Sequence, residues 1–210
     1  MKKDKAHFIA FAGVMFALII VLFLLESFVL TGLGVTACIL SLPVSIALSI
    51  YDDWKKSFLG GTLLGLASCL FCLIMASFII YANPLISVLP RTFIGITSYW
   101  TYRGISKLTG KAKNAFVRDI IPASVAGVVG SVTNTVLYLL AVNIWMGSIE
   151  SSLTDILTVA VSIYFPIELA ACLILVPIYT KVLKKINHTL ITKPEKVTAD
   201  GENVVNDNMS

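Results

Sequence analysis

Six long apolar runs dominate the sequence. They extend approximately over residues 8–30, 35–51, 58–81, 85–102, 117–145 and 156–182, and charged residues, glycine or proline separate them. Crossing the hydrocarbon layer of a membrane, about 30 Å thick, takes roughly 20 apolar residues in a helix. With 57% of its 210 residues hydrophobic and only 13% charged, the chain has more apolar surface than one water-soluble core can bury. We therefore expect an all-α integral membrane protein with six transmembrane helices.

The basic residues predict an orientation, because lysine and arginine gather on the cytoplasmic side of membrane proteins. With six spans and a cytoplasmic N-terminus, 15 of the 16 basic residues fall on one side. We therefore interpret the net charge of +4 as topology and predict that both termini are cytoplasmic. Residues 1–186 are expected to form the membrane domain, and the polar residues 187–210 a disordered cytoplasmic tail.

Arg91 and Glu168 are ionisable residues inside the apolar runs. Arg91 follows Pro90 at the start of the fourth run, and Glu168 lies near the middle of the sixth. Because an ionisable group in a membrane segment is costly, each is a candidate functional residue. A guanidinium suits a carboxylate or phosphate, and a carboxyl group accepts hydrogen bonds from hydroxyls or amides. Either the two residues pair with each other or they bind a ligand.

Polar and aromatic side chains accompany these two residues. Asn134 lies in the fifth run between threonines, on one helical face with Gly127, Gly130 and Tyr138, which predicts an open groove that ends in an amide. Pro43 and Pro166 are expected to kink the second and sixth helices. An apolar, aromatic pocket with a few polar groups is typical of a small-molecule site; hydrogen bonding between helices is the alternative.

Small residues form a stripe on the first run, at Ala6, Ala10, Gly13 and Ala17. The spacings of four, three and four place them on one helical face, where another helix can approach closely. That helix can belong to the same chain or to a partner.

Motifs of enzymes are not found. The sequence has no Walker-type phosphate loop, no H-E-x-x-H and no G-x-S-x-G. Glu168 as a general acid or base would need a nucleophile or metal ligands, yet His7 and His188 lie at opposite ends of the chain. The C-x-x-C pair Cys69 and Cys72 has no second pair to complete a metal site. We therefore expect no enzyme, no metal or cofactor, and no nucleic-acid partner.

The six runs, the small-residue stripe, NPLISVLPRTFIG at 83–95 and GSVTNTVLYL at 130–139 together resemble a known family. Over roughly residues 5–186 the chain resembles the substrate-binding S components of energy-coupling factor (ECF) vitamin transporters. The resemblance implies a six-helix protein in the plasma membrane of a prokaryote that captures a water-soluble vitamin. It also implies partners: a transmembrane T component and two cytoplasmic ATPases, which complete an ABC importer. In that family the first helix docks on the T component through A-x-x-x-A, which Gly13 and Ala17 match as G-x-x-x-A, with Ala6 and Ala10 as a second pair.

Within the family the chain is most similar to the pantothenate type. The matched residues are Arg91, Asn134 and Glu168, which suit the carboxylate, amide and hydroxyls of pantothenate. Further expected site residues are Asn83, Tyr99, Thr133, Tyr138 and Tyr164. Folate, a pyridoxine-type vitamin or a thiamine precursor stay open as ligands, and so does a membrane assembly subunit without a transport role.

Overall fold

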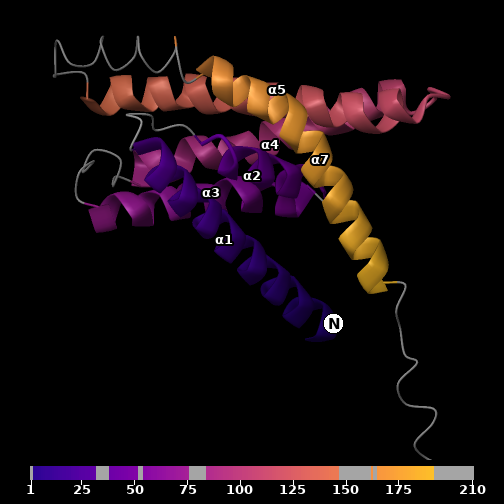
Figure 1. Ribbon diagram of the computed structural model, residues 1–210, viewed down its shortest axis with the longest axis horizontal. Helices are drawn as coiled ribbons and strands as arrows, with labels where there is room; N and C mark the ends of the chain where they lie inside the picture. The colour runs from indigo at the N-terminus through magenta and orange to yellow at the C-terminus, as the bar shows by residue number, and fades with distance from the viewer. Residues whose placement is uncertain are drawn as a thin grey trace, which may run out of the picture.

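The structure, a computed structural model, describes residues 2–31, 38–51, 54–75, 84–146, 162 and 165–191. These residues form six helices, and the all-α prediction is confirmed for them (Figure 1). The helices are α1 (Lys2–Thr31), α2 (Ser41–Tyr51), α3 (Trp54–Met75), α4 (Pro84–Thr109), α5 (Ala115–Met146) and α7 (Phe165–Ile191).

Helix α2 lies at the centre of the bundle. It packs against α1, α3, α4, α5 and α7, and every residue from Ser41 to Ile50 is buried. With 11 residues it is about 16 Å long at 1.5 Å per residue, about half the thickness of the hydrocarbon layer. Its role is therefore to fill the interior and to carry polar groups into it.

Serine and glycine, rather than large side chains, lie at several contacts between helices. Ser41, Ser45 and Ser49 form a fully buried face of α2. A Cβ added to Gly60 of α3 would overlap the carbonyl of Ser45, and one added to Gly95 of α4 would overlap the carbonyl of Ser57. Small residues let backbones approach closely, as in membrane helix pairs.

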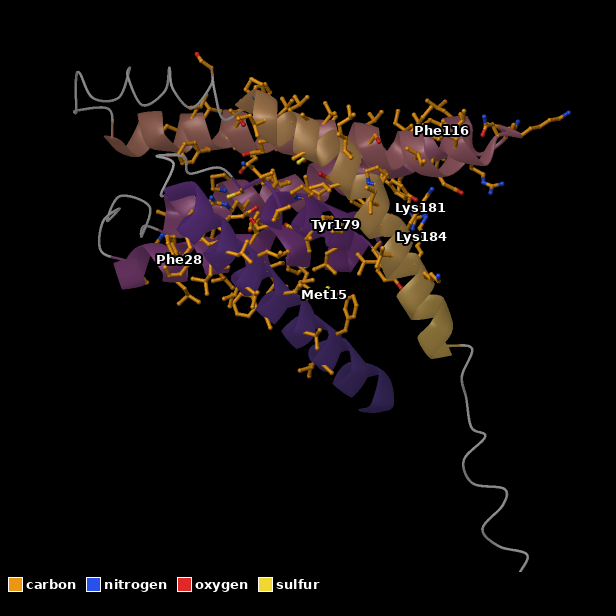
Figure 2. The ribbon with its side chains drawn as sticks, in the orientation of Figure 1. Met15, Phe28, Phe116, Tyr179, Lys181 and Lys184 are labelled. Atoms are coloured by element: carbon orange, nitrogen blue, oxygen red, sulfur yellow. The ribbon has the colours of Figure 1, made fainter. Side chains whose placement is uncertain are left out.

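Large apolar side chains cover the outside of the bundle. Ile9, Phe28, Trp100 and Phe116 are more than half exposed, and Figure 2 labels Phe28 and Phe116 among them. Serines inside and large apolar residues outside suit a lipid surrounding better than water. Three of the described helices are long and apolar enough to span a membrane, with windows Ile9–Glu26, Phe116–Ala141 and Phe165–Lys185. Six membrane spans therefore remain a prediction.

The two prolines expected to kink helices lie at the starts of helices instead. Pro43 and Pro166 lie in the first turns of α2 and α7, where the missing N–H would have no partner within the helix. The prediction of kinks at these positions is therefore wrong. The prolines inside helices are instead Pro90 in α4, Pro122 in α5 and Pro177 in α7.

The Lys2 end of α1 and the Ile191 end of α7 extend to the same side of the bundle in Figure 1. Near that end of α7, Lys184 Nζ donates a hydrogen bond of 2.9 Å to Tyr102 Oη of α4. Further into the bundle, Met15 of α1 shares an apolar cluster with Leu183 and Tyr179 of α7 (Figure 2). Helix α7 continues to Ile191, past position 186, where we placed the end of the membrane domain. That division and the cytoplasmic termini stay predictions.

Candidate functional site

Glu168 and Asn134 meet, as the ligand-site hypothesis requires. Glu168 lies in the first turn of α7, whereas the sequence placed it near the middle of a span. It is 8% exposed, and its Oε1 accepts hydrogen bonds from Asn134 Nδ2 at 3.1 Å and Ser131 Oγ at 3.2 Å, both on α5. Ser131 is not among the site residues predicted from the sequence, although it precedes Asn134 by three residues and therefore shares its helical face.

Arg91 on α4 has a donor that the described residues leave unused. Its Nη1 donates to the Ser87 carbonyl at 2.8 Å and to Ser87 Oγ at 3.0 Å. Its Nε is buried and has no hydrogen-bond partner among the described residues. An unmade hydrogen bond of a buried charged group is costly, so this guanidinium is suited to bind an anionic partner.

Helix α3 fixes the backbone at Arg91. A Cβ added to Gly61 would overlap the Arg91 carbonyl, and one added to Gly65 would come to 2.7 Å from the Cα of Val88. The Thr62 and Thr92 hydroxyls lie 3.2 Å apart across the same contact. Gly61 and Gly65 form a G-x-x-x-G pair, the sequence signal for such a contact.

Arg91 and Glu168 do not form the internal salt bridge that the sequence left open. Within the described part of the chain, the ion pair present joins Arg118 and Asp119 at the surface, with 3.4 Å between Nε and Oδ1. Arg91 and Glu168 are near enough to interact electrostatically, but each makes its hydrogen bonds with other groups. The positive charge of Arg91 therefore stays available.

Glu26 of α1 is a second buried acid, which the sequence analysis missed. It is 5% exposed and accepts hydrogen bonds from the backbone N–H of Leu40 and from Ser41, whose N and Oγ lie 3.0 and 2.6 Å away. Helix α2 has no acidic residue in its own first turn, so Glu26 supplies the negative charge that a helix N-terminus favours. The rule that selected Arg91 and Glu168, an ionisable residue in an apolar run, would have found it.

These groups form one polar cluster, which we define as Glu26, Arg91, Ser131, Asn134 and Glu168. Glu26 and Arg91 both act electrostatically on Glu168. Cys38, just before α2, is within electrostatic range of all three charged groups. The cluster thus takes its residues from α1, α4, α5 and α7. One guanidinium with an unused donor, a carboxyl group and an amide can bind a small anion that carries hydroxyl or amide groups.

Two of the other expected site residues, Thr133 and Tyr99, make contacts outside the polar cluster. Thr133 Oγ1 donates to the Val129 carbonyl of its own helix at 2.7 Å. Tyr99 is buried, with its ring 6.0 Å from that of Trp100 and 5.4 Å from the Arg103 guanidinium. Tyr138 is half-buried. Asn83 and Tyr164 lie outside the described residues. A ligand role for these five stays a prediction.

The open groove expected along α5 is not present at its glycines. A Cβ added to Gly127 would come to 2.7 Å from the Cys172 carbonyl of α7, and one added to Gly130 to 2.8 Å from Ile46 of α2. These glycines serve close helix packing instead, so the groove prediction is wrong at Gly127 and Gly130.

The small-residue stripe of α1 faces outward. Ala10, Gly13 and Ala17 are exposed, and a Cβ added to Gly13 would meet nothing within 4 Å. The side chain of Ala6 lies outside the described residues. The described part of the stripe is thus free to receive a helix from another chain.

Comparison with known proteins gives a relative of this chain. It is 29% identical over 166 residues to the pantothenic acid transporter PanT of Lactococcus lactis subsp. cremoris, covering 70% of this chain and 78% of that protein. No family model and no solved structure matches the chain. This relative and the apolar helices suggest a membrane transport protein rather than an enzyme. The resemblance found in the sequence is therefore confirmed: the chain is similar to a pantothenate transporter.

Proposed function

We propose that this chain is the S component of an ECF-type ABC importer and that it binds pantothenate. The observation that carries the proposal is the Arg91 guanidinium, whose buried Nε finds no hydrogen-bond partner in the described part of the chain. The similarity to a protein named a pantothenic acid transporter supports this ligand.

The charges around Arg91 favour an anionic ligand. Glu26 receives its hydrogen bonds from the start of α2, and Glu168 receives its hydrogen bonds from α5. Neither acid therefore uses the arginine for its hydrogen bonding. A ligand carboxylate beside Arg91 would pair with the guanidinium through a charge-assisted hydrogen bond.

The remaining groups of pantothenate suit the other side of the polar cluster. Its amide and hydroxyls can both donate and accept, and the Glu168 carboxyl and the Asn134 amide offer both functions. In this proposal Ser131 holds Glu168 in place, while Asn134 contacts both Glu168 and the ligand.

The proposed partners follow from what the chain does not carry. Since the sequence has no ATP-binding motif, the two ATPases of the importer would supply the energy. The exposed stripe of Ala10, Gly13 and Ala17 on α1 would dock on the T component. The protein would be a multi-pass protein of a prokaryotic plasma membrane, with both termini in the cytoplasm.

Ligand identification tests the proposal directly. The purified protein would be denatured and the released small molecule identified by mass spectrometry, with a thermal-shift panel of pantothenate, folate, pyridoxine and thiamine precursors alongside. We expect pantothenate in the first experiment and stabilisation by pantothenate alone in the second. Stabilisation by another vitamin would change the ligand, and no stabilisation by any of them would favour a membrane assembly subunit.

A further inference from the structure

Glu26 connects α1 to the start of α2 through directed bonds. Two backbone N–H groups, of Leu40 and Ser41, and the Ser41 hydroxyl all donate to its carboxyl group. The donors are 14 and 15 residues further along the chain, so the bonds link the C-terminal part of α1 to the start of α2. The free N–H groups of a helix N-terminus and a carboxylate form a favourable, charge-assisted contact.

The other described contacts of α1 with the bundle are apolar. Met15 and Ile19 are buried in the two apolar clusters, and Phe23 packs edge-on against Phe71 of α3 at 5.4 Å. Apolar contacts are non-directional, so they restrict the position of α1 along α2 less than hydrogen bonds do. Glu26 is therefore the contact that fixes where α2 begins relative to α1.

The same carboxyl group belongs to the polar cluster. It acts electrostatically on Glu168 and on Cys38, while Ser41, its hydrogen-bond partner, begins the central helix that touches α4, α5 and α7. A change in the Glu26–Ser41 contact would therefore reach the surroundings of Arg91 and Glu168.

We propose that Glu26 is a positioning residue for the ligand site: by holding the start of α2 against α1, it keeps the polar cluster in the arrangement that binds ligand. The proposal deepens the proposed function and rests on it for the identity of the ligand. Because coupling between two contacts is reciprocal, ligand binding should also stabilise the bonds from Leu40 and Ser41 to Glu26.

Hydrogen exchange combined with titration calorimetry tests this on the full chain in detergent, with pantothenate as the probe. Glu26→Gln keeps the size of the side chain and one acceptor oxygen but removes the charge, and Ser41→Ala removes one of the three donors. Ser49→Ala is the matched control, since Ser49 is equally buried on the same face of α2 and its hydroxyl bonds within α2 to the Ser45 carbonyl.

We expect pantothenate to slow exchange at the Leu40 and Ser41 amides of the wild type. In Glu26→Gln these amides should exchange about tenfold faster and pantothenate should bind about tenfold more weakly, as loss of charged hydrogen bonds implies. Ser41→Ala should show smaller changes of the same sign. Ser49→Ala should change neither quantity.

Two results would overturn the positioning role. One is wild-type pantothenate affinity in Glu26→Gln; the other is faster exchange spread evenly over all helices, which marks a global loss of stability. If the wild type itself fails to bind pantothenate, the proposed function fails. Hydrogen exchange alone then tests whether Glu26 holds the start of α2. Unchanged protection of Leu40 and Ser41 in Glu26→Gln would then refute the Glu26 link.

Discussion

Two adjacent residues on α5, Thr133 and Asn134, have different kinds of hydrogen-bond partner. Asn134 donates to Glu168 across the helix interface, whereas the hydroxyl of its neighbour Thr133 bonds to its own helix. Asn134→Ala should weaken pantothenate binding by about 1–3 kcal/mol, because Glu168 loses a donor and the ligand loses an amide partner. Titration calorimetry on the purified protein measures this change.

Thr109→Ala is the control for that experiment, because the Thr109 hydroxyl bonds within its own helix, to the Ile105 carbonyl, and Thr109 is not among the expected site residues. Its affinity for pantothenate should stay near that of the wild type. If Thr109→Ala weakens binding more than Asn134→Ala does, the placement of the ligand on the Asn134 side is wrong.

Part of the polar cluster can be predicted from the sequence. Arg91 and Glu168 stand out because charge is costly in an apolar run, and the same rule applied to 8–30 would have found Glu26. Ser41 and Ser131 could not be found in this way, because serine is frequent in apolar helices and its role depends on which helix lies opposite. The hydrogen bonds to Glu26 and Glu168 are set by tertiary packing.

At the scale of the helix, the exposed stripe of α1 separates docking from ligand binding. Gly13 has open space beside it, and its face is not part of the polar cluster. Gly13→Trp should therefore block pantothenate uptake in cells that carry the complete importer, by preventing close helix approach. The affinity of the isolated protein for pantothenate should change little.

Leu18→Trp is the matched control, since Leu18 is 41% exposed but lies about 100° around the helix from the centre of the stripe. Uptake should persist in this variant. Lost pantothenate affinity in Gly13→Trp, with assembly of the importer intact, would contradict the docking role.

Glycine packing between α3 and α4 gives a second test at this scale. A Cβ on Gly61 would overlap the Arg91 carbonyl, whereas one on Gly104 would meet nothing within 4 Å. Gly61→Ala should lower the free energy of unfolding by about 1–3 kcal/mol through overpacking. Gly104→Ala should be neutral or stabilise by up to about 1 kcal/mol, because alanine favours a helix.

Thermal unfolding in detergent compares the two variants with the wild type. Equal midpoints for Gly61→Ala and Gly104→Ala would show that α3 does not approach α4 at Arg91.

Hydropathy predicted the helices better than their ends. Each apolar run overlaps a described helix, but α4 continues to Thr109 and α7 to Ile191, because backbone hydrogen bonding does not stop where the apolar residues stop. The second run was expected to begin at 35, while α2 begins at Ser41, where Glu26 caps it. That cap joins residues far apart in the sequence, and no local pattern shows it.

For the whole molecule, the charge asymmetry predicts the orientation in the membrane. With six spans, 15 of 16 basic residues lie on the side of both termini. In a cysteine-free background, a cysteine at Ser148 should react with an impermeant thiol reagent added outside intact cells. A cysteine at Thr198 should react only after the cells are opened. Outside labelling at both positions, or at Thr198 alone, would contradict the six-span orientation.

In the proposed site, the guanidinium of Arg91 binds the carboxylate of pantothenate. Titration calorimetry with pantothenate and with pantothenol, its alcohol analogue, measures this contact. The wild type should prefer pantothenate, and Arg91→Ala should lose about 2–5 kcal/mol of binding free energy for pantothenate alone. Arg91→Lys should recover part of this loss, and Arg118→Ala, which removes an exposed arginine paired with Asp119, should bind as the wild type does. Equal affinity of the wild type for both compounds, or undiminished pantothenate binding by Arg91→Ala, would show that Arg91 does not bind the carboxylate of pantothenate.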